Sequence, residues 1–173
     1  MYSNLSFSIT KNKIAGSIEQ VEDEKFGAKP NSIKFTQTYD PEYFGRYHSE
    51  VVKHNAARIG LTGYYGWAFK LHETWKFDNV QFTISQFITD FSDWDKCVKH
   101  HKKAWSPTTM FFLEQGNILY TRIRTGNICQ EQANVKVFPI GPITPGKWHT
   151  LVLGVNWQST GANVQTVHNM NSK

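Results

Sequence analysis

Residues 108–126, TTMFFLEQGNILYTRIRTG, decide the fold, because a turn-forming segment separates two short runs rich in apolar and β-branched residues. Both runs, Thr108–Leu113 and Ile118–Arg124, have the length of ordinary β-strands. The Gln-Gly-Asn segment at 115–117 contains residues that favour tight turns. The stretch therefore predicts two strands joined by a turn.

The same pattern recurs along the chain, and sustained helical periodicity is scarce. Further strands are predicted at Leu5–Ile9, Ser32–Thr38, Arg46–Lys53, Gly63–Leu71, Val80–Asp90, Val135–Phe138 and Trp148–Trp157. Turn-forming pairs such as Asp40-Pro41 and Pro145-Gly146 separate them. Many short strands between such turns indicate an all-β fold, and a jelly-roll sandwich of two curved antiparallel sheets fits best.

Length and composition fit a single globular domain over residues 1–173. Hydrophobic residues make up 39% of the chain and charged residues 19%, which is typical of a folded protein. No window approaches the roughly 18 apolar residues that span a membrane, so we expect no membrane partner. The first residues, MYSNLSFSITKNK, lack the apolar core of a secretory signal.

The formal net charge of +5 would attract a polyanion. The basic run KHHKK at 99–103 has no helical spacing and is expected to be a solvated loop. Zinc-knuckle spacing and an RRM-type aromatic signature are both absent, so we expect no nucleic-acid partner. An acidic polysaccharide and no polyanion at all both remain compatible with the charge.

The two cysteines, Cys97 and Cys129, do not form a metal-binding pattern, since no CxxC spacing exists. They are either two buried thiols or a disulfide. We expect the disulfide because both lie near predicted loops, and a disulfide would indicate an oxidising compartment.

Several catalytic signatures are missing. Retaining glycosidases built on such sandwiches place Glu, Asp and Glu at alternating positions of one strand, and no Glu in this chain is followed two positions later by Asp. Metalloprotease HExxH, the GxSxG nucleophile elbow and a phosphate-binding loop are also absent. The sequence therefore argues against retaining-glycosidase chemistry and offers no motif for these other reactions.

The stretch GRYHSEV, residues 45–51, combines a cation, an imidazole and a carboxylate. In a strand, Arg46, His48 and Glu50 would share one face because side chains alternate.

Other predicted strands supply compatible groups. Gln86 lies among apolar neighbours, Tyr120, Arg122 and Arg124 would share one strand face, and Tyr65 adds an aromatic ring. Arginine binds carboxylates through two parallel hydrogen bonds, so such a surface suits a chain of sugar acids.

One reaction on such a polymer needs few acidic residues. In β-elimination a base removes the proton next to the uronate carboxylate, and the glycosidic oxygen leaves from the neighbouring carbon. Groups that neutralise the carboxylate stabilise the enolate-like intermediate, and a histidine can serve as the base. Arg46, His48 and Gln86 are residues of the right types.

These segments also carry a family resemblance. In order, GRYHSEV, YYGWAFKL, SQF, the stretch around 106–129 and GKWHTLVLGVNW resemble fungal polysaccharide lyases of the glucuronan lyase type. These lyases belong to a wider jelly-roll group together with alginate lyases and heparin lyase I. The resemblance covers Ser32–Gly161. It implies a jelly roll with a concave cleft, an extracellular enzyme, and endo-cleavage of β-1,4-linked polyglucuronate.

The resemblance also implies roles for individual residues. Arg46 would contact the substrate carboxylate, His48 would be the base, Glu50 would orient a neighbour, and Gln86 would neutralise the uronate. The chemistry would need no cofactor, a structural calcium ion would lie away from the cleft, and we expect a monomer.

The segment after Trp157 departs from the family pattern. Ser159 and Gly161 continue it, but ANVQTVHNMNSK is polar and lacks a sustained strand pattern. We therefore expect a truncated sandwich, incomplete at its C-terminus and marginally folded, without the strand that carries the catalytic tyrosine. The general acid stays open. The alternatives are a non-catalytic jelly roll that binds acidic polysaccharide and a basic structural protein.

Overall fold

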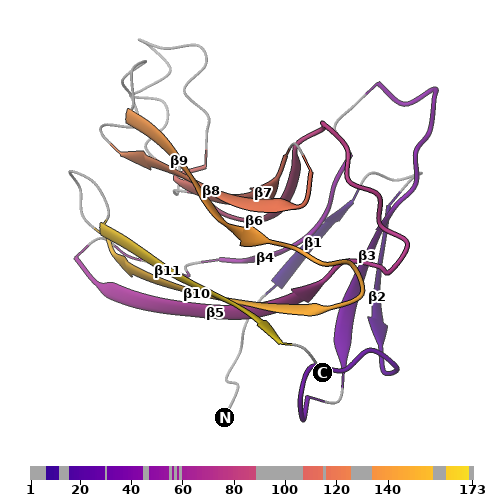
Figure 1. The fold of residues 1–173 in the computed structure, drawn as a ribbon, viewed down its shortest axis with the longest axis horizontal. Coiled ribbons are helices and arrows are strands. Elements are labelled where there is room, and N and C mark those ends of the chain that lie inside the picture. Colours follow the sequence, from indigo (N-terminus) through magenta and orange to yellow (C-terminus); the bar gives the residue numbers. More distant parts are fainter. Residues whose placement is uncertain are drawn as a thin grey trace. The chain divides into compact units, whose positions relative to one another are not determined.

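All regular elements in the described part of the chain are β-strands, which confirms the all-β prediction (Figure 1). The computed structural model describes residues 7–11, 16–29, 31–44, 47–54, 56, 58, 60–88, 107–114, 116–125, 134–157 and 163–171. The chain divides into two compact units, Met1–Ala56 and Ala57–Lys173. The expectation of a single domain stays a prediction.

The first unit contains a pair of two-stranded antiparallel sheets. Strand β1 (Phe7–Lys11) pairs with β4 (Ser49–Lys53). Strand β2 (Gly16–Val21) pairs with β3 (Ser32–Gln37). β3 lies where the sequence predicted it, whereas β2 was not predicted.

The predicted strand over Arg46–Lys53 is shorter in the structure. β4 begins at Ser49, and His48 precedes it. Ser49 is also where the β3–β4 loop, residues 38–48, closes. Gln37 Nε2 donates to Ser49 Oγ, which donates to the backbone oxygen of Thr36 at 3.2 Å. Side chains of this stretch therefore alternate between the two faces of a strand only from Ser49 onward, and His48 is not part of that pattern.

The second unit contains a three-stranded and a four-stranded antiparallel sheet. The first has the order β11-β10-β5, formed by β5 (Thr62–Lys70), β10 (Trp148–Asn156) and β11 (Asn163–Asn171). The second has the order β6-β7-β8-β9, formed by β6 (Phe82–Phe87), β7 (Thr109–Leu113), β8 (Ile118–Thr125) and β9 (Asn134–Pro142). Figure 1 shows these two sheets as two layers.

The core of the second unit lies between its two sheets. Alternate residues of β10, among them Leu151 and Leu153, are fully buried and pack in one cluster with Phe111 of β7 and Leu119 of β8. Val152, between the two leucines, is 43% exposed. This alternation is the period of two that the sequence predicted for a sandwich.

The expectation for the end of the chain was partly wrong. Asn163–Asn171 form β11, and all nine residues pair with β10. Strand pairing uses backbone N–H and C=O groups, so a polar segment joins an available edge without an alternating apolar pattern.

Candidate active site

The face of the β6–β9 sheet opposite the core carries the candidate site, and we call it the outer face. Gln86 of β6 pairs with Met110 of β7, Met110 pairs with Arg122 of β8, and Arg122 pairs with Val137 of β9. Partners that lie directly opposite each other in neighbouring strands point to the same side. The amide of Gln86 and the guanidinium of Arg122 therefore share one face.

A β-bulge in β6 places Gln86 on that face. Phe82 pairs with Leu113, a core residue, but the register shifts by one residue between Thr83 and Ser85. Without the shift, Gln86 would lie on the same face as Phe82, because both positions are even-numbered. The bulge thus turns Gln86 away from the core.

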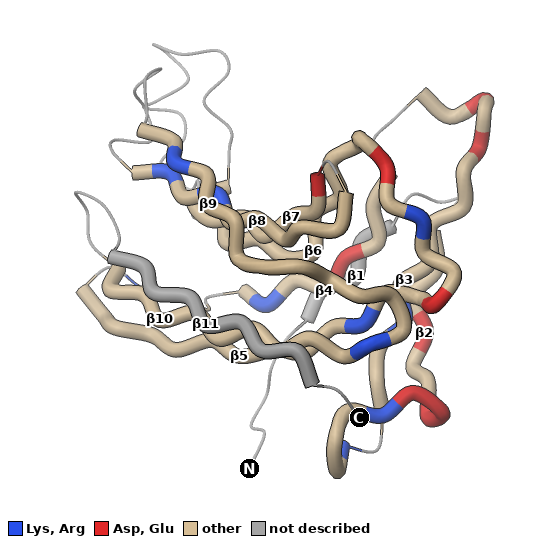
Figure 2. The backbone as a smooth tube through the Cα atoms, viewed as in Figure 1, with Lys and Arg blue, Asp and Glu red and all other residues tan. Residues whose placement is uncertain are grey.

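Tyr120 and Arg124 of β8 lie on the outer face with Arg122. The ring of Tyr120 stacks on that of Phe112, with centroids 5.8 Å apart and an angle of 21°. Phe112 is only 2% exposed, so it supports Tyr120 from a buried position. Arg124 pairs with Val135 of β9. Figure 2 shows basic positions on β8 and β9.

The guanidinium groups of β8 are partly removed from water. Burial lowers the pKa of Arg122, and the charge of Arg124 lowers it further. The Arg122 guanidinium nevertheless remains a cation at neutral pH, as arginine does in proteins. Arg124 Nε is buried and has no hydrogen-bond partner among the residues the structure describes. An anion bound here would relieve repulsion between the two cations.

The remaining catalytic candidates belong to the first unit. His48 is half-buried and precedes β4, and Glu50 lies within β4 opposite Thr10. Arg46 lies outside the described residues. Since His48 and Gln86 belong to different units, their convergence on one substrate stays a prediction.

Tyr65 lies on the core side of β5. Trp157 Nε1 donates a hydrogen bond to Tyr65 Oη at 3.0 Å, and the ring contacts that of Phe87 edge-on at 4.9 Å. Both rings pack against the core cluster. The outer face that contains Gln86 does not include Tyr65.

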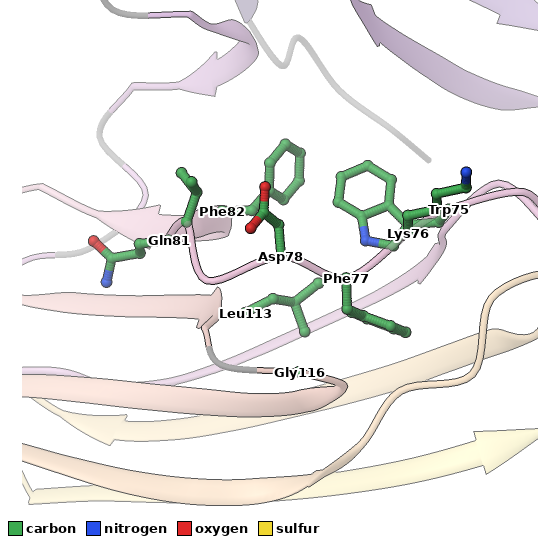
Figure 3. Close-up of a pocket in the computed structure, with 9 residues that line it drawn as sticks. Trp75, Lys76, Phe77, Asp78, Gln81, Phe82, Leu113 and Gly116 are labelled. Carbon is green, nitrogen blue, oxygen red and sulfur yellow. The ribbon is translucent and has the colours of Figure 1, made fainter.

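A small pocket, which was not predicted, lies at one end of the β6–β7 pair (Figure 3). Its volume is about 160 Å³, and it is lined by Trp75, Lys76, Phe77, Asp78, Val80, Gln81, Phe82, Leu113 and Gly116. Trp75 and Phe82 meet edge-on with centroids 4.7 Å apart. Because Phe82 pairs with the core residue Leu113, the pocket lies on the core side of the sheet, away from the outer face.

Three other expectations concern features outside this surface. Cys97 and Cys129 lie outside the described residues, so their disulfide stays a prediction. Within the described ranges, no group of three or more His, Cys, Asp or Glu could hold a metal ion. The expected calcium site stays a prediction. No helix in the same ranges is long and apolar enough to cross a membrane.

Comparisons with known proteins agree with this architecture. A family model described as polysaccharide lyase matches residues 3–165. The crystal structure of an endo-β-1,4-glucuronan lyase from the fungus Trichoderma reesei is similar, with 30% sequence identity and a TM-score of 0.73. The similarity covers 94% of this chain and 70% of that one. No curated protein matches. The likeness confirms the predicted jelly-roll fold and the predicted family resemblance.

Proposed function

The chain belongs to the polysaccharide lyase family, and from that premise we propose that it cleaves a polyuronate, with β-1,4-linked polyglucuronate as the first candidate, by β-elimination. The observation that carries the proposal is the register Gln86–Met110–Arg122, which places a neutral amide and a cation on one face. We further propose that the enzyme acts outside the cell, where such polymers occur.

Gln86 and Arg122 would bind the carboxylate of the sugar whose proton is removed. The guanidinium offers two parallel N–H donors to the carboxylate oxygens, and the amide N–H₂ offers another. Both contacts strengthen as negative charge moves into the carboxylate during proton removal. They therefore lower the barrier more than they strengthen ground-state binding.

His48 would take the proton from the carbon next to the carboxylate. The electron pair of that C–H bond forms a double bond to the neighbouring carbon. The bond between that neighbouring carbon and the glycosidic oxygen breaks, and the departing oxygen receives a proton. A neutral imidazole suits this task because one of its ring nitrogens carries a lone pair that can accept the proton. Half-burial of His48 is compatible with such a role.

Tyr120 and Arg124 would bind sugars that neighbour the one held by Arg122. They flank Arg122 along β8 on the same face, and residues two apart on a strand are about 6.6 Å apart. A polymer with one carboxylate per sugar can thus meet two cations in succession. Affinity for the polymer should then fall as salt concentration rises.

The test is the growth of ultraviolet absorbance from unsaturated uronate when the chain is incubated with polyglucuronate, with alginate as the second substrate. Wild type should produce the signal, and the variants H48A and Q86A should lose it while keeping a wild-type circular dichroism spectrum. Reducing-end formation without the unsaturated product would indicate hydrolysis and overturn the proposal. Polymer binding without any product would favour the non-catalytic binding module.

A further inference from the structure

The β3–β4 loop carries a cluster of tyrosine rings, Tyr39, Tyr43 and Tyr47, which we call the tyrosine cluster. Tyr39 stacks on Tyr47 with centroids 6.3 Å apart and an angle of 24°. Tyr43 meets Tyr47 edge-on at 5.0 Å. Tyr47 is thus the central ring, and it directly precedes His48 in the chain.

Hydrogen bonds hold the cluster in place. Tyr47 Oη donates to the backbone oxygen of Asp40 at 2.6 Å, and the backbone N–H of Asp40 donates to Tyr47 Oη at 2.9 Å. An Asx turn follows, in which the N–H of Glu42 donates to Asp40 Oδ1 at 2.9 Å. The bonds of Ser49 close the base of the same loop. Tyr39 directly precedes Asp40 in the chain and stacks on the ring that these bonds hold.

Tyr39 nevertheless remains 80% exposed, although it is stacked on a fixed ring. A single exposed aromatic residue needs no explanation, but an exposed ring held by a stack and a closed loop is a pre-organised binding surface. The C–H groups on one face of a pyranose ring are weakly positive, and they match the negative face of an aromatic ring.

We propose that Tyr39 is a stacking platform for one sugar ring of the polysaccharide, at a subsite next to His48. The inference rests on the proposed function, because family membership supplies the occupant and the position of Tyr47 beside His48 ties the platform to the proposed base. Tyr47 is the positioning residue that holds the platform.

The charges of the loop define how the sugar binds. Asp40 and Glu42 follow Tyr39 in the same loop, and Glu42 is exposed. A uronate carboxylate gains nothing from pointing toward these groups, so Tyr39 contacts the ring face while the carboxylate points away. The contribution of Tyr39 to binding is then insensitive to salt, unlike that of Arg122 or Arg124.

The experiment measures steady-state kinetics on long polyglucuronate at low and high salt. Y39A should raise KM about tenfold, corresponding to about 1.4 kcal/mol, with kcat within about twofold, and the ratio to wild type should be the same at both salt concentrations. Y39F keeps the ring and should behave like wild type. The control is F44A, because Phe44 is 96% exposed in the same loop and should leave KM unchanged. Y47F, which removes the hydroxyl, should raise KM with little effect on kcat.

The outcomes separate this inference from the proposed function. If wild type is active, H48A and Q86A are inactive, and Y39A matches F44A, the platform is wrong and the proposed function stands. If wild type binds polymer without cleaving it, the dissociation constant replaces KM, and equal binding by Y39A and wild type overturns the platform. If wild type neither cleaves nor binds polyuronate, both proposals are wrong.

Discussion

Gln86 and Arg122 lie on one register line of the β6–β9 sheet, two strands apart, with Met110 directly between them. Adjacent strands are about 4.8 Å apart, so the two backbones are separated by roughly 10 Å. Long side chains can converge over that distance on a single carboxylate. The candidate site thus depends on strand register, and a slip of one residue would turn one of the two groups to the other face.

The guanidinium geometry of Arg122 should matter more than its charge alone. R122A should lower kcat/KM on polyglucuronate by about 10- to 150-fold, since hydrogen bonds to charged groups contribute about 1.5–3 kcal/mol. R122K should recover only part of this, because lysine cannot form two parallel hydrogen bonds. Initial rates of unsaturated-product formation provide the measurement.

The control for Arg122 is K136A. Lys136 is an exposed cation on β9 that pairs with Ile123, so it points away from the outer face. The K136A substitution removes one positive charge from the same sheet, as R122A does. If net charge is a minor factor, kcat/KM should change by less than about twofold. Equal losses in R122A and K136A would show that only net charge matters.

Adjacent residues of β10 should differ sharply in their contribution to stability. L153A should reduce the free energy of unfolding by about 2–5 kcal/mol, because Leu153 is fully buried in the core. V152A should cost less than about 1 kcal/mol, since Val152 is 43% exposed on the opposite face. Urea denaturation followed by circular dichroism measures both. Similar losses would mean that the β5–β10–β11 sheet does not pack as described.

The fold class could be predicted from the sequence because apolar strands and turn residues are local signals. The hairpin over 108–126 illustrates this: β7 and β8 begin and end within one residue of the prediction. β2 and β11 were missed because they carry few apolar residues and gain their structure from backbone pairing with a neighbour.

The candidate site could be predicted less completely than the fold class. Alternation along β8 indicates that Arg122 and Arg124 share a face, but the face of Gln86 depends on the bulge between Thr83 and Ser85. No residue type in that stretch indicates a bulge. His48 lies outside β4, so the alternation expected from Arg46 to Glu50 does not extend to it. Register and strand ends are set by tertiary pairing rather than by local sequence.

The turn before β10 requires glycine at position 146. Gly146 has a φ of +75°, and a Cβ there would lie 3.4 Å from Glu73 Cβ. Its N–H donates to the backbone oxygen of Leu71 at 2.9 Å, so the turn cannot easily change shape. G146A should lower the free energy of unfolding by about 1–2 kcal/mol.

The control for Gly146 is G66A. Gly66 lies in β5 with extended backbone, and a Cβ there would meet only Leu151 O at 3.9 Å. The change in unfolding free energy should stay within about 0.5 kcal/mol. Equal effects of the two substitutions would exclude backbone conformation as the reason for glycine at 146.

His149 should make stability depend on pH. Its side chain is fully buried, its ring stacks on Phe69 at 5.6 Å, and the N–H of Thr144 donates to its Nε2 at 3.1 Å. Burial lowers the pKa of His149, and the backbone oxygen of Thr144, 3.3 Å from Nε2, offsets part of that effect because it favours the protonated ring. The imidazole is therefore neutral in the folded chain at pH values where the unfolded chain begins to bind a proton.

The sign of the effect follows from linkage. Below pH of about 6.5, the unfolded histidine binds a proton that the buried one resists, so the free energy of unfolding falls as pH falls and levels off above that value. H149Q keeps a hydrogen-bond acceptor without a titrating group and should have a shallower slope between pH 5 and 7. H72Q alters an exposed histidine, leaves His149 in place and should keep the wild-type slope. Urea denaturation at several pH values measures all three slopes, and an unchanged slope in H149Q would assign the pH dependence to other groups.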